Sequence, residues 1–105
     1  MLIINESTFD QQVLKSSIPV VVEFGATWCQ PCRQLEPVLA KLGQEWGNKA
    51  VLAKVDVDES ANLAMKFGIM SVPTVILFTV GQAAARFSGY QSRERILEKL
   101  GTFIR

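Results

Sequence analysis

Three short runs of apolar residues constrain the fold of this chain more than any other feature. They are Pro19–Phe24, Val51–Val55 and Thr74–Phe78, and valine, isoleucine and threonine are frequent in them. Runs of this length and composition are typical of strands that are covered on both faces, as in a parallel or mixed sheet between helices. The sequence therefore predicts a central sheet that is buried on both sides.

Helical patterns and turn signals separate these runs. Apolar residues recur at helical spacing over residues 29–46, and a shorter pattern over 61–67 ends at Gly68. After the third run, Val80-Gly81 predicts a tight turn into a returning strand over residues 83–87. We therefore expect the last two strands to form an antiparallel hairpin.

The two ends of the chain complete the pattern. Leu2–Ile4 predicts a short strand, and Ser7 is expected to cap a first helix in which Phe9 and Val13 share a face. Ser92 is expected to cap the last helix. The residues of its predicted apolar face are Ile96, Leu97, Leu100, Phe103 and Ile104. In this order the elements predict one domain over residues 1–105, an α/β fold built as a three-layer α/β/α sandwich around a mixed sheet.

Composition excludes several classes of function. Lys and Arg number 11 and Asp and Glu 10, and the resulting net charge of +1 argues against a nucleic-acid or anionic-membrane binder. The absence of histidine removes His-based catalytic triads and imidazole metal sites. No targeting segment or membrane-length apolar stretch is visible, so the expected location is cytoplasmic.

The chemistry is concentrated in the segment Trp28-Cys29-Gln30-Pro31-Cys32, which follows a predicted strand and opens a helix. At a helix N-terminus, free N–H groups and the helix dipole stabilise a thiolate, so Cys29 is the expected nucleophile. Cys32 shares its face of the helix and can close a small disulfide with Cys29. These are the parts that thiol–disulfide exchange needs.

Two other interpretations of the cysteine pair compete with this one. A zinc half-site would need two further ligands, which carboxylates or a second chain would have to supply, because the chain has no other cysteine and no histidine. A purely structural disulfide would close a loop so short that it gains little stability.

Two charged residues interrupt the apolar runs. Glu23 lies in the first run and Lys54 in the second, and on neighbouring strands the two side chains would lie close together behind the cysteines. Buried charges are rare unless they are paired. The competing interpretation is that each side chain points to an edge or extends to water.

The chain resembles the thioredoxin family over essentially its whole length. The resemblance rests on Trp28-Cys29-x-Pro31-Cys32, on Pro37 inside the helix, on Val72-Pro73-Thr74, and on Gly81 and Gly89. It implies a small cytoplasmic protein disulfide reductase that acts as a monomer without a bound cofactor. It also implies a partner, an NADPH-dependent flavoprotein reductase of the thioredoxin reductase type, and clients that are disulfide-containing proteins.

The resemblance also assigns roles to individual residues. It implies that Glu23 stands at the position of a buried aspartate and accepts a proton from Cys32, with Lys54 as its partner. It implies that Pro73 is cis and faces a redox disulfide between Cys29 and Cys32. The residues expected to contact substrate are Trp28, Pro31, Val72, Pro73, Gly89 and Tyr90.

The sequence departs from the family pattern at four positions in or near this site. Glu23 is longer than the family's aspartate by one methylene, and Gly25 replaces a frequent tryptophan. Gln30 replaces the usual glycine between the cysteines, and Tyr90 replaces a small apolar residue. Two alternative functions use the same scaffold: an exported thiol oxidant or isomerase, and a binding module that does not depend on redox state.

Overall fold

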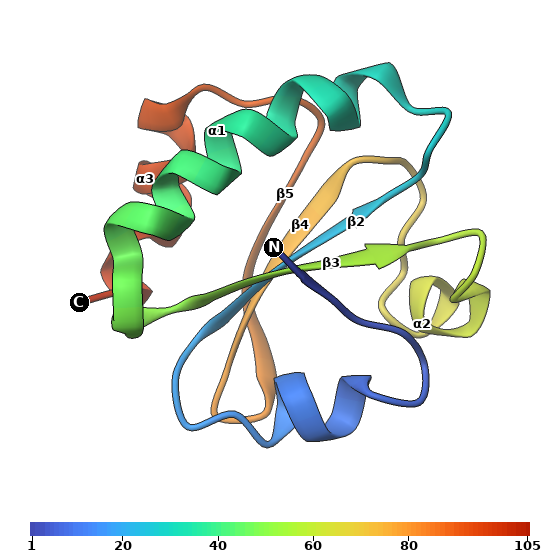
Figure 1. Cartoon of the computed structure of the whole chain (residues 1–105), viewed down its shortest axis with the longest axis horizontal. Coiled ribbons are helices and arrows are strands. Elements are labelled where there is room, and N and C mark those ends of the chain that lie inside the picture. Colours follow the sequence, from blue (N-terminus) through green and yellow to red (C-terminus); the bar gives the residue numbers. More distant parts are fainter.

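The computed structural model describes residues 1–105, and β2 (Val20–Gly25) lies at the centre of its five-stranded sheet. The strand order is β1-β3-β2-β4-β5 (Figure 1). β2 pairs in parallel with β3 (Val51–Asp56) and antiparallel with β4 (Thr74–Thr79). β1 (Leu2–Ile3) lies parallel beside β3, and β5 (Gln82–Ser88) lies antiparallel beside β4. The prediction of a mixed sheet with a terminal hairpin is confirmed.

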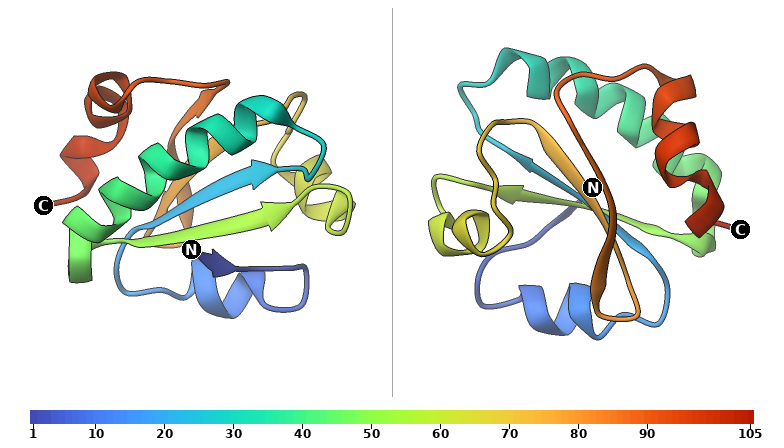
Figure 2. Two further views of the ribbon diagram at one scale, coloured as in Figure 1. Left: turned by 45° about the horizontal axis from the view of Figure 1, so that its top comes forward. Right: turned by 180° about the vertical axis from the view of Figure 1, so that it is seen from behind.

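Helices cover both faces of this sheet. The helical segments are α1 (Gln30–Trp46), α2 (Ala61–Lys66), α3 (Arg93–Leu100), a π-helical turn Asp10–Leu14, and 3-10 turns Gly47–Lys49 and Gly101–Phe103. Figure 2 shows α1 and α3 on one side of the sheet, and the first helical turn and α2 on the other. This is the three-layer arrangement that the sequence predicts.

Alternation along β2 explains why the protein has two cores. Successive side chains of a strand point to opposite faces. Val20, Val22 and Phe24 pack with the first helical turn and α2, whereas Val21 packs with α1 and α3. Glu23 falls on the same face as Val21, so its side chain is directed toward the layer that contains α1 and the cysteines.

The β4–β5 hairpin turns at Val80 and Gly81, as predicted, and both residues have positive φ angles, 52° and 73°. Such angles at both central residues give the turn a twist that matches the flanking strands. β2 continues through Gly25. Gly25 is paired in register with Asp56, and its carbonyl accepts a hydrogen bond from the Val57 N–H at 2.9 Å.

The first helix differs from its prediction. Ser7 is not the cap: Asn5 Oδ1 accepts hydrogen bonds from the backbone N–H groups of Ser7 and Thr8, at 2.9 and 3.2 Å. Both residue types can cap, and Asn5 lies closer to the end of the strand, where the chain turns. The helical segment that follows is a single π-helical turn, but Phe9 and Val13 are both buried, as predicted.

The predicted apolar face of the last helix is only partly correct. Ser92 caps α3 by accepting a hydrogen bond from the Arg95 N–H at 3.3 Å, and Ile96 and Leu100 are fully buried. Leu97 and Phe103 are exposed instead. The reason for Phe103 is that α3 ends at Leu100 and continues as a 3-10 turn, which has 3.0 residues per turn, so later side chains leave the α-helical stripe.

Candidate active site

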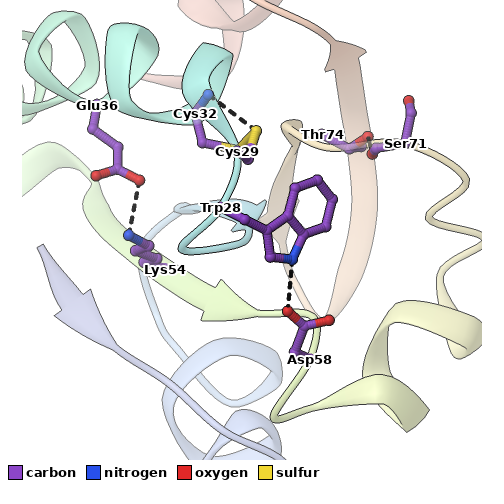
Figure 3. The surroundings of a disulfide bond; sticks show 8 residues. All are labelled: Trp28, Cys29, Cys32, Glu36, Lys54, Asp58, Ser71 and Thr74. Carbon is purple, nitrogen blue, oxygen red and sulfur yellow. Dashed lines mark hydrogen bonds and ion pairs between the residues drawn. A yellow bond between two sulfur atoms is a disulfide. The ribbon is translucent and has the colours of Figure 1, made fainter.

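The two cysteines lie where β2 leads into α1, and they form a disulfide (Figure 3). Cys29 is the N-cap residue of α1, and its Sγ accepts a hydrogen bond from the Cys32 N–H at 3.2 Å. Pro31 occupies the first turn, where the helix loses no hydrogen bond through its missing N–H. Backbone N–H groups and the helix dipole therefore act on Cys29 Sγ, which favours its thiolate in the reduced state.

Both sulfur-bearing residues are nearly inaccessible in this oxidised state. Cys29 is 3% exposed and Cys32 is 0% exposed. The reason is that Ala26, Val57 and Val72 pack against the disulfide. Access is nevertheless unequal, since Cys29 retains the small exposed area and Cys32 has none.

Glu23 lies directly behind the disulfide. Its side chain is 0% exposed, and neither carboxyl oxygen has a hydrogen-bond partner. A Cβ atom added to Gly25 would lie 2.8 Å from Glu23 Oε2 and 3.2 Å from Cys32 Sγ. Because both distances start from one point, the carboxyl oxygen and the sulfur are at most about 6 Å apart. The interpretation of Glu23 as an edge residue or a side chain that reaches water is wrong.

Burial sets the protonation of Glu23. The pKa of its carboxyl group is raised from 4.5 to about 8, mainly by desolvation. The neighbouring Glu36 carboxylate raises this pKa further, and the Lys54 ammonium lowers it. A carboxyl group with this pKa exchanges a proton near neutral pH, which is the range that a general acid or base needs.

Lys54 lies beside Glu23 but is ion-paired elsewhere. The two residues are register partners on β2 and β3, as predicted, yet Lys54 Nζ lies 2.8 Å from Glu36 Oε2 (Figure 3). Hydrogen bonding to Glu36 raises the pKa of Lys54, although partial burial lowers it. Sequence reasoning missed Glu36. The available signal was its spacing, since Glu36 lies four residues after Cys32 and hence on the same face of α1.

Trp28 lies on the solvent side of the cysteines. Trp28 is 64% exposed, so it is a surface residue and not part of a core. Its indole N–H donates a hydrogen bond to Asp58 Oδ2 at 2.9 Å (Figure 3). Sequence reasoning missed this contact. Asp56 Oδ1 in turn accepts a hydrogen bond from the Asp58 N–H at 2.8 Å, which orders the loop.

An apolar pocket of about 330 Å³ opens beside Trp28. It lies between the loop after β3, α2 and the segment that precedes β4, and Met65 and Met70 at its edge are strongly exposed. The residues that form its lining are Trp28, Val57, Ala61, Ala64, Met65, Ile69, Met70, Ser71 and Val72. Tyr90, another predicted substrate contact, is also exposed. The side chains of the pocket form an apolar rim beside the disulfide, because Val57 and Val72 also pack against it. Sequence reasoning did not include the two methionines in this rim.

The Val72–Pro73 peptide bond is cis, as the resemblance implies. Val72 packs against the disulfide, and its backbone N–H and C=O form none of the hydrogen bonds within the chain. The Gly89 N–H donates to the Pro73 carbonyl at 2.8 Å, and Gly89 has a φ of 77° that favours glycine. Thr74 Oγ1 donates to the Ser71 carbonyl at 2.7 Å, which ties down the other side of this segment.

No group of three or more Cys, His, Asp or Glu side chains is arranged to hold a metal ion. No helix is both long enough and apolar enough to cross a membrane.

A dicysteine pair at the first turn of a helix, on this fold, defines a thiol–disulfide oxidoreductase. Comparison with known proteins identifies the family. The family model described as thioredoxin matches residues 1–102. The chain belongs to the thioredoxin family, and its Cys29–Cys32 pair is the redox-active CxxC pair of a thioredoxin-type disulfide reductase.

Curated relatives agree with this assignment. The chain is 39% identical over 94 residues to a thioredoxin of Alicyclobacillus acidocaldarius, with 90% of each chain covered. It is 37% identical over 102 residues to a chloroplastic M-type thioredoxin of Pisum sativum, covering 97% of this chain and 59% of the relative. It is 38% identical over 101 residues to a bifunctional thioredoxin reductase/thioredoxin of Mycobacterium leprae, covering 96% of this chain and 22% of the relative. The chain thus spans less than two thirds of the length of the last two proteins.

Proposed function

We propose that this chain reduces disulfide bonds in client proteins and serves as a general electron donor for cell redox homeostasis. The observation that carries this proposal is the unpartnered Glu23 carboxyl group next to the Cys32 sulfur, behind a disulfide at the N-terminus of α1. A structural disulfide needs no buried acid with a pKa near 8, whereas a dithiol that is oxidised and reduced repeatedly must release and regain protons.

The first step is attack by Cys29. In the reduced protein its thiolate, stabilised at the N-terminus of α1, attacks one sulfur of the client disulfide. A bond forms between Cys29 Sγ and that sulfur, the client S–S bond breaks, and the other client sulfur leaves as a thiolate. The product is a mixed disulfide between the two proteins.

The second step releases the client. Glu23 takes the proton of the Cys32 thiol, and the Cys32 thiolate attacks Cys29 Sγ. The Cys29–Cys32 bond forms, the mixed disulfide breaks, and the second client sulfur leaves as a thiolate. Two electrons pass from the protein to the client, and the protein ends in the disulfide state that the structure contains.

The apolar rim is suited to hold an extended client segment beside Cys29. The free N–H and C=O of Val72 can pair with such a segment as an added strand. Trp28, the pocket beside it and the exposed Tyr90 ring supply apolar contacts in this proposal. Pro31 shapes the first turn of α1, and Pro73 shapes the backbone after Val72. Gly89 carries no side chain, and the space at its Cβ position is open. It therefore presents no side chain that would block a client segment.

The proposed partner is an NADPH-dependent flavoprotein of the thioredoxin reductase type, which would return electrons to the Cys29–Cys32 disulfide. The relative in Mycobacterium leprae supports this proposal, because it is named as both a thioredoxin reductase and a thioredoxin. We propose that the protein acts in the cytoplasm as a monomer and without a bound cofactor. Some relatives are instead named as chloroplastic proteins.

Insulin reduction tests this function. The protein should accelerate the precipitation of insulin chains by dithiothreitol, and should also do so with NADPH and a thioredoxin reductase as the electron source. Failure of both reactions would contradict the proposal. Oxidation of a reduced client without turnover by the reductase would support the alternative of an oxidant or isomerase.

A further inference from the structure

Gly25 occupies an unusual place for a glycine. It is the last residue of β2, it is buried, and it is not among the glycines with a positive φ angle. Its backbone therefore does not require glycine, and a glycine within a strand weakens the strand without adding a packed side chain. Such a residue marks a place where another group approaches closely.

The approaching groups are the Glu23 carboxyl group and the Cys32 sulfur. Both take part in the resolving step, in which Cys32 attacks Cys29 Sγ and releases the client. Glu23 and Gly25 are two residues apart on one strand, so they face the same side of the sheet. A Cβ atom at position 25 would lie 2.8 Å from Glu23 Oε2 and 3.2 Å from Cys32 Sγ. The first distance is below any normal contact between carbon and oxygen, and the second is tight for a sulfur held in a disulfide.

We propose that Gly25 is a positioning residue for the resolving step: its missing Cβ leaves the space in which the Glu23 carboxyl group lies beside the Cys32 sulfur. This inference rests on the proposed role of Glu23 as the group that accepts the Cys32 proton. Neither carboxyl oxygen has a hydrogen-bond partner, so no hydrogen bond fixes the position of the group. A methyl group at position 25 must therefore displace the carboxyl group, since the sulfur is anchored to α1.

The length of the acid is part of the inference. A glutamate extends one methylene farther than an aspartate and needs the space above residue 25, whereas an aspartate would withdraw from it. The two positions should therefore be coupled: alanine at 25 should be harmful with glutamate at 23 and tolerated with aspartate at 23. A general loss of strand stability would not depend on the acid in this way.

Stopped-flow reaction with 5,5′-dithiobis(2-nitrobenzoate) separates the two chemical steps. Attack by Cys29 on the reagent forms a mixed disulfide and releases one 2-nitro-5-thiobenzoate. Attack by Cys32 on Cys29 Sγ then forms the protein disulfide and releases a second one. Both releases are seen as absorbance, so attack and resolution are measured in the same experiment.

The test is a cycle of Gly25→Ala, Glu23→Asp and the double variant. Gly25→Ala should slow the second release about tenfold, a fraction of what general base catalysis supplies, and leave the first release unchanged. It should also shift the pH profile of the second release. In the Glu23→Asp background, Gly25→Ala should change the second release by less than about twofold. Gly101→Ala is the matched control, because an added Cβ there meets no other atom, and it should alter neither release.

The outcomes are separable. An equal slowing by Gly25→Ala in both backgrounds, or no slowing in either, would overturn the inference. Glu23→Gln tests the proposed function independently: if it leaves the second release unchanged, the role of Glu23 itself fails. If Gly25→Ala proves too unstable to assay, the double variant should fold more stably than it does, and a double variant that is equally unstable would also overturn the inference.

Discussion

Behind the Cys29–Cys32 disulfide lie three ionisable side chains, and in front of it lies an apolar surface that is open to solvent. Glu23 is fully buried at the back, with Lys54 and Glu36 beside it. Trp28 and Met70 are exposed at the front. Most proteins place charge outside and large apolar groups inside. A buried ionisable group and exposed apolar side chains both lower stability. Each is explained by one part of the reaction: proton transfer explains the buried acid at the back, and client contact explains the apolar surface at the front.

The largest expected effects separate the two cysteines, because each serves one side. Cys29→Ser should lower insulin reduction by on the order of a thousandfold or more, since no nucleophile remains at the front. Cys32→Ser should still attack a client but should stop as a mixed disulfide, because nothing on the back side resolves it. Mass spectrometry of each variant after mixing with an oxidised client checks this. Covalent trapping by Cys29→Ser instead would reverse the assigned roles.

The buried Glu23 carboxyl group lowers the stability of the fold at neutral and higher pH. The pKa of Glu23 is raised in the folded protein from 4.5 to about 8, so the folded state binds this proton more tightly than the unfolded state does. Folding stability from this group is therefore complete below about pH 4.5 and declines by about 1.4 kcal/mol per pH unit as the pH rises toward 8. Glu23→Leu removes that decline.

Glu23→Leu should accordingly raise the free energy of unfolding by roughly 2–4 kcal/mol at pH 8 and by much less at pH 5. Lys54 keeps its ion pair with Glu36 in this variant, so no cation is left without a partner. The same variant should slow the resolving step. Denaturant unfolding at the two pH values measures the gain. Lower stability at pH 8, or a gain that does not depend on pH, would contradict the prediction.

The back and the front of the disulfide also differ in how much of their structure can be predicted from the sequence. The strands, α1 and the cysteine pair are encoded by short-range patterns: apolar runs, helical spacing, and two cysteines three residues apart. Burial of Glu23 follows from its position within the run of β2. The Lys54–Glu36 ion pair cannot be predicted from the sequence, because it depends on where α1 crosses β3. The lysine side chain is long enough to reach either Glu23 or Glu36.

The front was harder to predict for a different reason. An isolated tryptophan or methionine in a sequence is expected in a core, and its exposure depends on the tertiary position of its loop. The hydrogen bond from Trp28 to Asp58 joins residues 30 apart in the chain, so no local pattern contains it. The cap at Asn5 was missed on a smaller scale, since Asn5 and Ser7 are equally good capping residues.

A smaller effect is expected from the front side. Trp28→Ala should lower kcat/KM for a protein client about tenfold, the effect of losing about 1.4 kcal/mol of contact energy. It should change the melting temperature little, because the ring is already exposed. Ile3→Ala is a matched control, since Ile3 is an exposed apolar residue on β1, at the far edge of the sheet from β4 and β5. An equal loss in the control would show that the effect is not specific to the rim.

The smallest effect should come from the partner of Lys54. Glu36→Gln removes a negative charge that raises the pKa of Glu23, and it frees Lys54, whose positive charge lowers that pKa. Both changes act in one direction, so the pKa of Glu23 should fall from about 8. The carbon-13 chemical shift of the Glu23 carboxyl group, followed against pH in the oxidised protein, measures this directly. Glu45→Gln is the control, because Glu45 pairs with Arg93 on the surface and that exposed ion pair does not involve Glu23. A rise in the Glu23 pKa in Glu36→Gln, or an equal fall in the control, would show that the three ionisable side chains behind the disulfide do not act as one cluster.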